Sequence, residues 1–438
     1  MACGRAETNI MAMLKSNTIF RVHELTRMLE EHYRHSITIL DKAVKVVQKP
    51  EDEIHMTRHI RYRLRIRHAP NRKTEYLTFY CKISPIYLLR ITPIITLNLL
   101  MRFRKEIYAY KVMIPNMDKF QKERSQITLR DTDLFSNIFP KCYGARLTLQ
   151  VSDAPDSGSA LVLDDLPQRG YVNMDFRNGI DLETMKSMLR LLARYHGTTL
   201  AFKYVLPYKF DEVIDPCLKW FNFAPDSYVC VPSEVDYLRK HILKTSFKTR
   251  IDVVDRLMQF SLNNMTQPTT DAWVSVCHGK FMLYNVMRRE FDVPKFVEFK
   301  IIDLQHQVRR HVLTDVILFL MTSCPPNFTR EQCDIALYWY YEELFNNLRR
   351  YNGVILTEFK KHEFKYEVRD TFKREFVRGL QMLRFVCCKK IHEDKVRSLS
   401  TWPRYDLREI ESCIDYNLYY RRLQEVLVNI FDHDIFDL

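Results

Sequence analysis

Glycine is scarce in this chain of 438 residues, and where it is missing matters more than how little there is. The sequence holds 9 glycines, and none lies between Gly4 and Gly144. Loops that bring backbone N–H groups close to phosphate oxygens need glycine, because side chains would clash with the phosphate. A glycine-rich phosphate loop is therefore excluded from the first third of the chain.

Paired cysteine motifs are also missing. The 11 cysteines are an odd number, and no Cys-x-x-Cys spacing occurs. Cys387 and Cys388 are adjacent, which suits neither a local disulfide nor a tetrahedral zinc site. We therefore expect reduced, structural thiols.

Long uninterrupted apolar runs are absent as well. The most apolar window, residues 83–101, contains Arg90 and two prolines, so we expect a buried or amphipathic segment there and no membrane span. The first residues, MACGRAETNIMAMLKS, lack the basic start and apolar stretch of a signal peptide. These features together favour a cytoplasmic location.

The charge of the chain is strongly positive, at +13. The basic residues are spread along the sequence without a run of five, and no RRM, KH, homeodomain or zinc-finger signature is present. We expect a solvated basic surface and no nucleic-acid partner. An adaptor function, in which a basic face binds an acidic partner, remains an alternative.

The first part of the chain is rich in β patterns. Residues 60–67 alternate apolar side chains with arginine, which predicts a half-buried strand with an arginine face. A turn at 69–73 leads to a partner strand at 75–84. Helices are expected at 17–33, capped by Asn17, and at 97–113.

The later part of the chain is mostly helical. An apolar helical face begins after Asp181, and Asn352-Gly353 is typical of a helix end. Two further helical stretches are expected at 358–392 and 405–432.

Several chemically active side chains follow one another in a definite order. A strand lysine, Lys82, is followed by a helix glutamate, Glu106, and by Asp164 and Asp165 after an apolar strand at 160–163. The later members are the segment LLARYH at 191–196, then His278-Gly279 with Asn285, then Ile302-Asp303, and then Asp315. Each element is weak alone, and the order is what makes the signal specific.

In this order the chain resembles the insect ecdysteroid kinase-like family (EcKinase, or CHK kinase-like). This family is related to choline kinase and aminoglycoside phosphotransferases. The resemblance covers residues 40–350, and the matching segments are FYCKISP, FRKEIYAY, FPKCYG, ALVLDDL, LLARYH, VCHG with its Asn, KIIDLQ and TDVILFLMTS.

The resemblance implies an α+β, two-lobed protein-kinase-like fold. A small N-lobe with an antiparallel sheet and one helix would occupy residues 36–160, after an N-terminal helical segment at 1–35. A larger, mostly helical C-lobe would occupy 161–438. ATP with Mg²⁺ would bind between the lobes, and the acceptor would be a small hydroxylated lipophilic molecule, with ecdysteroids the named case.

The resemblance also implies roles for particular residues. Lys82 would pair with Glu106 and hold the α- and β-phosphates, and Asn285 with Asp303 would bind Mg²⁺. His278 would orient the catalytic loop. The segment that includes Leu163 and Asp164 would lie near the adenine.

Each assignment has a structural alternative. Lys82 and Glu106 could be solvated surface charges, and His278 could be a core histidine with satisfied hydrogen bonds. Asp315 is expected to cap the helix that follows it. Asp303 is harder to explain structurally, because a carboxylate at the end of an apolar strand must be paired, hydrogen-bonded or bound to metal.

The chain departs from the family pattern at its catalytic position. The family has His-Gly-Asp where this chain has His278-Gly279-Lys280. The aspartate accepts the proton of the attacking hydroxyl, and a lysine, a cation at neutral pH, cannot do so. Structurally, Lys280 could form a salt bridge with Asp303, or a hydrogen bond with Asn285, in place of the metal.

Other departures are milder. The expected phosphate loop reads Lys49-Pro50-Glu51-Asp52-Glu53, and its carboxylates would repel a triphosphate. Met282 and Tyr284 stand where the family has Trp and Asn, and Leu304 follows Asp303 in place of Phe.

Three hypotheses follow for the function. The first is a pseudokinase that binds a ligand without turnover. The second is an active ATP-dependent small-molecule kinase, with Asp164, Asp165 or Asp315 as a substitute base. The third is the basic, non-catalytic adaptor.

Overall fold

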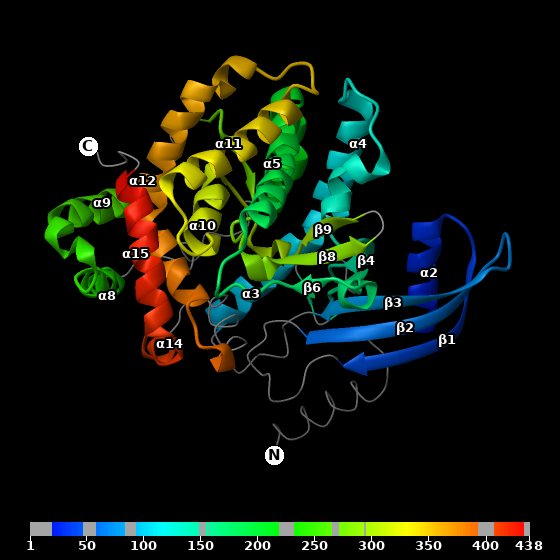
Figure 1. Ribbon diagram of the computed structural model, residues 1–438. Helices are drawn as coiled ribbons and strands as arrows, with labels where there is room; N and C mark the ends of the chain where they lie inside the picture. Colours follow the sequence, from blue (N-terminus) through cyan, green and yellow to red (C-terminus); the bar gives the residue numbers. More distant parts are fainter. Residues whose placement is uncertain are drawn as a thin grey trace. The chain divides into compact units, whose positions relative to one another are not determined.

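The protein is described from a computed structural model, and its chain forms two compact units (Figure 1). The first unit comprises Met1–Lys111 and Pro140–Tyr171, and the second comprises Val112–Phe139 and Val172–Leu438. The segment Val112–Phe139 thus groups with the C-terminal part of the chain, and the expected lobe boundary at residue 160 stays a prediction. The structure describes residues 20–46, 58–83, 93–148, 155–156, 158–218, 232–264, 271–292, 295–392 and 407–432.

The first unit is built on a five-stranded antiparallel sheet with the strand order β1-β2-β3-β5-β4. Its strands are β1 (Ile37–Val46), β2 (Arg58–His68), β3 (Thr74–Ile83), β4 (Cys142–Arg146) and β5 (Ala160–Asp164). Two helices belong to the same unit, α2 (Val22–Tyr33) and α3 (Pro93–Tyr108). The expected helix cap Asn17 and the acidic segment 49–53 lie outside the described residues.

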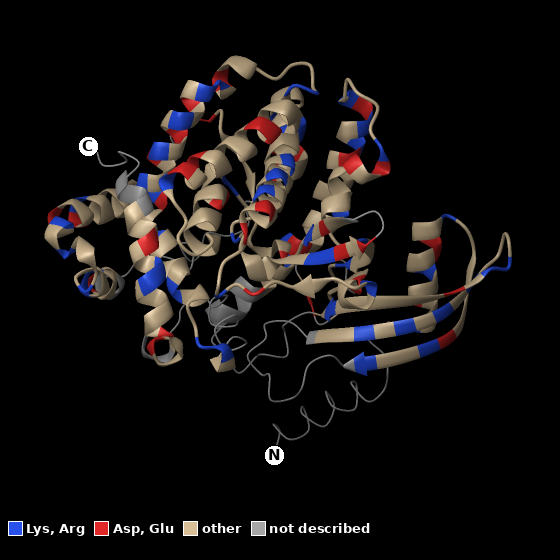
Figure 2. Cartoon of the chain, viewed as in Figure 1, with Lys and Arg blue, Asp and Glu red and all other residues tan. Residues whose placement is uncertain are grey.

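The alternating pattern of β2 determines which face of this sheet is buried against α2. Its apolar side chains, from Ile60 to Ile66, are at most 3% exposed and pack with Leu25 and Leu29 of α2 in one core. The arginines therefore fall on the opposite face, where they appear as blue bands along β2 in Figure 2. The prediction of a half-buried strand with an arginine face is confirmed.

Helix α3 begins earlier and ends earlier than the expected range of 97–113. The chain continues from Tyr108 as a single π-helical turn at Ala109–Met113. Cross-strand register places Lys82 of β3 opposite Leu161 of β5, on the face of the sheet that α2 does not cover.

The second unit is mainly helical. Its principal helices are α4 (Ile114–Arg124), α5 (Leu182–Val205), α6 (Pro207–Lys209), α7 (Asp215–Leu218), α8 (Pro232–Ile242), α9 (Ile251–Asn264), α10 (Leu313–Ser323), α11 (Arg330–Leu348), α12 (Lys361–Val386), α14 (Leu407–Cys413) and α15 (Tyr416–Asp432). Among the described residues, no helix combines the length and apolar character needed to cross a bilayer.

Helix α5 forms where the sequence predicts it. Asp181 is the N-cap, and its side chain accepts a hydrogen bond from the N–H of Thr184 at 2.8 Å. The apolar face, including Met185, Leu189 and Tyr195, is fully buried. This helix packs against α11, while α10 packs against α12 (Figure 1).

Two short sheets carry the loops of the second unit. Strand β7 (Val274–Cys277) pairs with β10 (Val308–His311), and the hairpin of β8 (Val286–Asp292) and β9 (Lys295–Ile301) pairs with β6 (Val172–Asn173).

The expected helix end at Asn352-Gly353 is wrong, because α11 ends at Leu348. The N–H groups of Arg350 and Tyr351 bond to Asn347 and Leu348, three residues back, which tightens the chain out of the helix before the glycine.

Candidate functional site

Lys82 and Glu106 form a close ion pair in the first unit. The Lys82 Nζ lies 2.7 Å from Glu106 Oε1, and only 13% and 2% of the two side chains are exposed. A buried carboxylate needs such a partner, since an unpaired one is costly. The surface-charge alternative for both residues is therefore wrong, whereas their role in holding phosphates stays a prediction.

The residues expected near the adenine form a second charged cluster in the same unit. Leu163 is buried in β5, and the Asp164 carboxylate lies 2.7 Å from Arg169 Nε. Asp165 is fully buried and binds the guanidinium of Arg61 through two hydrogen bonds. Both carboxylates are thus neutralised by arginine.

Sequence reasoning did not find the Arg61–Asp165 pair. Arg61 lies on β2 and Asp165 follows β5, and β3 lies between these two strands. The sequence showed only an arginine on an alternating strand and a carboxylate after an apolar strand. Neither pattern indicates that these two residues form a pair.

The loop after β7 in the second unit is held by Asp315. Its carboxylate accepts hydrogen bonds from the N–H of His278 at 2.6 Å and from the N–H of Gly279 at 3.0 Å. The expectation that Asp315 caps α10 is wrong, because the N-cap is Val312 and Asp315 lies inside the first turn. Its side chain instead binds a loop 36 residues away in sequence. The residues next to Asp315 in the sequence give no indication of this contact.

His278 connects this loop to the strand that leads to Asp303. Its Nδ1 accepts from the N–H of Lys280 at 3.2 Å, and its Nε2 donates to the carbonyl of Ile302 at 3.0 Å. The ring therefore carries its proton on Nε2. His278 is thus a buried histidine with both ring nitrogens bonded, and its role in orienting the loop stays a prediction.

Gly279 is a position where only glycine fits. Its φ is +78°, and a Cβ there would lie 2.2 Å from the carbonyl oxygen of His306. Its own carbonyl accepts a hydrogen bond from Arg378 of α12 at 2.9 Å. Arg378 was not found from the sequence, because nothing in a helical pattern marks an inward-facing arginine as a loop contact.

Asn285 and Asp303 lie at the same end of the β8–β9 hairpin, since Val286 pairs with Ile301. The Asn285 side-chain nitrogen donates to the Lys280 carbonyl at 2.9 Å, so its side-chain oxygen is the atom that could bind a metal. Asp303 has a φ of +67°, a conformation that aspartate tolerates better than most residues. Its Oδ1 accepts from Gln305 at 2.7 Å.

Lys280 lies within this arrangement and is only 2% exposed. Its Nζ is 5.4 Å from the centre of the Tyr284 ring, a cation–π contact. The bond between Lys280 and Asn285 uses the lysine carbonyl. Asn285 and Asp303 offer oxygen donors of the kind that Mg²⁺ binds, but Lys280 lies in the loop that carries Asn285, and a lysine cation there opposes a divalent one. These residues do not fit a catalytic magnesium site.

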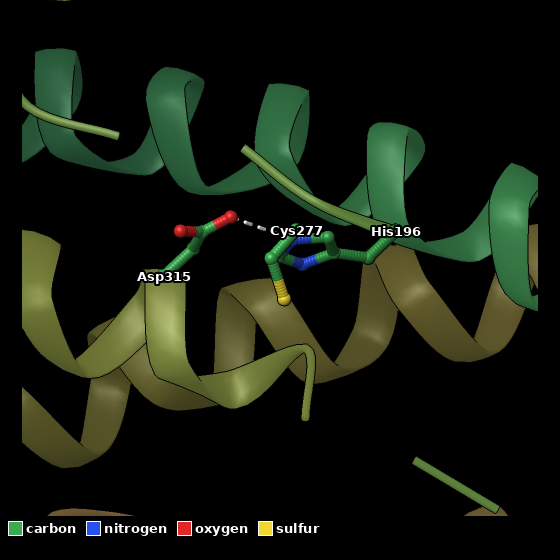
Figure 3. Close-up of side chains that lie close together, drawn as sticks. All are labelled: His196, Cys277 and Asp315. Atoms are coloured by element: carbon green, nitrogen blue, oxygen red, sulfur yellow. Dashed lines mark hydrogen bonds and ion pairs between the residues drawn. The ribbon is translucent and has the colours of Figure 1, made fainter. Parts of the chain in front are cut away.

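His196, Cys277 and Asp315 form a fully buried cluster behind the loop (Figure 3). Their candidate ligand atoms lie within 4.8 Å of one another. Burial raises the pKa of the Cys277 thiol, which donates to the His311 carbonyl at 3.3 Å. The His196 Nε2 lies 3.3 Å from Asp315 and its Nδ1 lies 2.8 Å from the Tyr340 hydroxyl. Metals bind the thiolate form of cysteine, and burial disfavours that form at Cys277. We therefore interpret the cluster as a structural anchor, which holds the loop through Asp315.

The protonation of the anchor follows from its contacts. Burial acts to raise the pKa of Asp315, but the hydrogen bonds from His196 and from the His278 N–H bring it below its ordinary value. Burial lowers the pKa of His196. Asp315 is thus ionised and His196 neutral near pH 7.

We predict that the free energy of unfolding falls as the pH drops below 6.5. Burial lowers the pKa of His241 to about 4. Between about pH 6.5 and 4 this histidine is therefore protonated in the unfolded chain and neutral in the folded protein, which lowers the free energy of unfolding. His241→Gln should therefore lose less stability between pH 7 and pH 5 than the wild type, measured by urea unfolding. His362→Gln, at a side chain 72% exposed, should behave as the wild type. Equal losses in all three proteins would refute the assignment.

The antiparallel sheet with its Lys82–Glu106 pair and the mainly helical second unit are features of a kinase-like fold. A family model described as "Ecdysteroid kinase-like family" matches residues 51–353, and the chain belongs to this family. A search of curated proteins found no significant match.

Solved kinase structures are similar at low identity. An ethanolamine kinase from Plasmodium vivax aligns at a TM-score of 0.38 and 10% identity, covering 89% of this chain and 83% of its own. A microcompartment-associated aminopropanol kinase aligns at a TM-score of 0.36 and 8% identity, covering 92% and 95%.

Proposed function

We propose that this protein is a pseudokinase of the ecdysteroid kinase-like family, which binds a small hydroxylated lipophilic molecule and transfers no phosphate. The observation that carries the proposal is Lys280, a buried lysine where the family has its catalytic carboxylate. In this family the carboxylate at that position accepts the proton of the attacking hydroxyl, and this chain has no carboxylate there.

None of the three candidate carboxylates is suited to replace the missing general base. Asp164 is paired with Arg169, and Asp165 with Arg61. Asp315 is fully buried and accepts two backbone hydrogen bonds. The hydrogen bonds to Asp315 lower its pKa and weaken it as a base.

Nucleotide binding is a separate question from transfer. The Lys82–Glu106 pair keeps a cation where the family would hold phosphates, which favours retained affinity for ATP and is the observation on the side of an active kinase. The family implies ATP with Mg²⁺, but Lys280, in the loop that carries Asn285, disfavours the metal. We infer that any ATP binding is independent of magnesium.

A cytoplasmic location is part of the proposal. The nine cysteines in the described part of the chain are all free thiols. Free thiols persist in a reducing compartment.

Thermal unfolding with ATP, with and without Mg²⁺, tests this proposal. We expect no difference between the two conditions up to millimolar ATP. A ligand at about 100 times its Kd stabilises by about 2.7 kcal/mol, so magnesium-dependent binding would be easy to see. A shift that needs magnesium and disappears in Asp303→Asn would overturn the proposal and support the active kinase.

A further inference from the structure

A groove of about 450 Å³ lies on the second unit between the first halves of α11 and α12. Its size is within the range of small-molecule sites. None of its lining residues belongs to the loop around Lys280. The nearest lining cation on α12, Arg369, precedes Arg378 by nine residues, which is about 14 Å along a helix.

Helical periodicity explains why these side chains meet. On α11, Arg330, Asp334 and Tyr338 recur every four residues, so they share one face. On α12, Lys361, Lys365 and Arg369 do the same, with apolar residues interleaved between them.

The floor of the groove is apolar and aromatic. Phe364, Val368 and Phe372 are at most 7% exposed, and the Tyr341 ring lies 5.0 Å from that of Phe364. At the edge, Tyr338 is 42% exposed. Such a floor suits a flat or chain-like apolar body.

The edge of the groove carries an excess of positive charge. Four basic side chains line it against two carboxylates. In the described part of the chain, none of the four forms an ion pair, although the Lys361 Nζ lies 5.0 Å from the centre of the Tyr338 ring. The basic residues are Arg330, Lys361, Lys365 and Arg369, and the acidic ones are Glu331 and Asp334.

Four cations against two carboxylates around one aromatic floor give the groove a net positive charge, which favours an anionic ligand. Lys and Arg recur along α12 in Figure 2. We propose that this groove binds a small amphipathic anion, an apolar body carrying a carboxylate, sulfate or phosphate ester. The apolar body lies on Phe364 and Tyr341, and the anionic group lies beside Lys365 and Arg369.

The probe for this site is 8-anilinonaphthalene-1-sulfonate, an aromatic anion that fluoresces on binding. Wild-type protein should bind it saturably, with displacement by dodecanoate. Its uncharged analogue, N-phenyl-1-naphthylamine, should bind at least about tenfold more weakly, because it offers nothing to the cations.

Two double variants locate the binding. Lys365→Glu with Arg369→Glu should weaken binding of the sulfonate at least about tenfold and leave the neutral analogue unchanged. Lys248→Glu with Arg349→Glu makes the same charge change at exposed residues outside the groove and should bind as the wild type. All four side chains are exposed, so melting temperatures should stay close to that of the wild type.

Three outcomes would overturn the proposal. One is no saturable binding of the sulfonate. Another is an equal loss in both double variants, which would mean attraction to the overall charge. The third is displacement only by an acidic peptide and not by dodecanoate, which would make the groove a protein-docking surface. None of these depends on whether the protein transfers phosphate.

Discussion

Replacing Lys280 with aspartate is expected to create a magnesium site that stabilises the protein by about 2.7 kcal/mol when Mg²⁺ is present at about 100 times its Kd. The change removes a buried lysine side chain and adds a second carboxylate, next to that of Asp303, in the loop that carries Asn285. Oxygen donors of this kind are what Mg²⁺ binds. The measurement is thermal unfolding of the variant and of the wild type, with and without Mg²⁺.

Two control variants separate the added ligand from the removed charge. Lys280→Ala takes away the ammonium and adds no donor, so it should gain little from Mg²⁺. The double variant Lys280→Asp with Asp303→Asn should lose the gain, because one of its two carboxylates is gone. If magnesium stabilises the wild type as strongly as Lys280→Asp, then Lys280 does not exclude the metal.

Replacing Asp315 with alanine is expected to destabilise the protein by about 3–5 kcal/mol. The substitution leaves the N–H groups of His278 and Gly279 buried without an acceptor, and each unmet group costs about 1–3 kcal/mol. The Nε2 of His196 loses its acceptor as well. Urea unfolding followed by circular dichroism measures the loss.

The matched control is Asp252→Ala, on a helix surface where the side chain is 75% exposed. It should change stability by less than about 0.5 kcal/mol. Asp315→Asn keeps one acceptor oxygen and should fall between the two. If Asp315→Ala is as stable as Asp252→Ala, the loop is not held by this carboxylate.

The residues that hold the loop in shape are different from the residue at the family's catalytic position. Asp315, His278 and Gly279 make the contacts that hold the loop in shape. None of these contacts uses the side chain at position 280. A lysine at position 280 is therefore compatible with the contacts that hold this loop.

The sequence predicted the sheet of the first unit well because its signals are local. Alternation in β2 specified which face is buried, and the cap Asp181 specified where α5 begins. The end of α11 was misplaced because hydrogen bonds three residues back, at Arg350 and Tyr351, closed the helix before the glycine.

The contacts of the candidate site were harder to predict because they join distant parts of the chain. Asp315 looked like a helix cap, since its neighbours in sequence are helical and its true partners lie 36 and 37 residues away. Arg61 and Asp165 are 104 residues apart, and Arg378 and Gly279 are 99 apart. Only the family resemblance, through the order of its motifs, indicated that Lys82 and Glu106 belong together.

The most direct test of the central claim is phosphate transfer from radiolabelled ATP, with Mg²⁺, to a panel of hydroxylated lipophilic acceptors. The account predicts that wild-type protein gives no transfer or phosphate release above the level of Asp303→Asn. Transfer by the wild type that depends on magnesium and is lost in Asp303→Asn would contradict it, and would show that this chain performs the family's chemistry with a lysine at position 280.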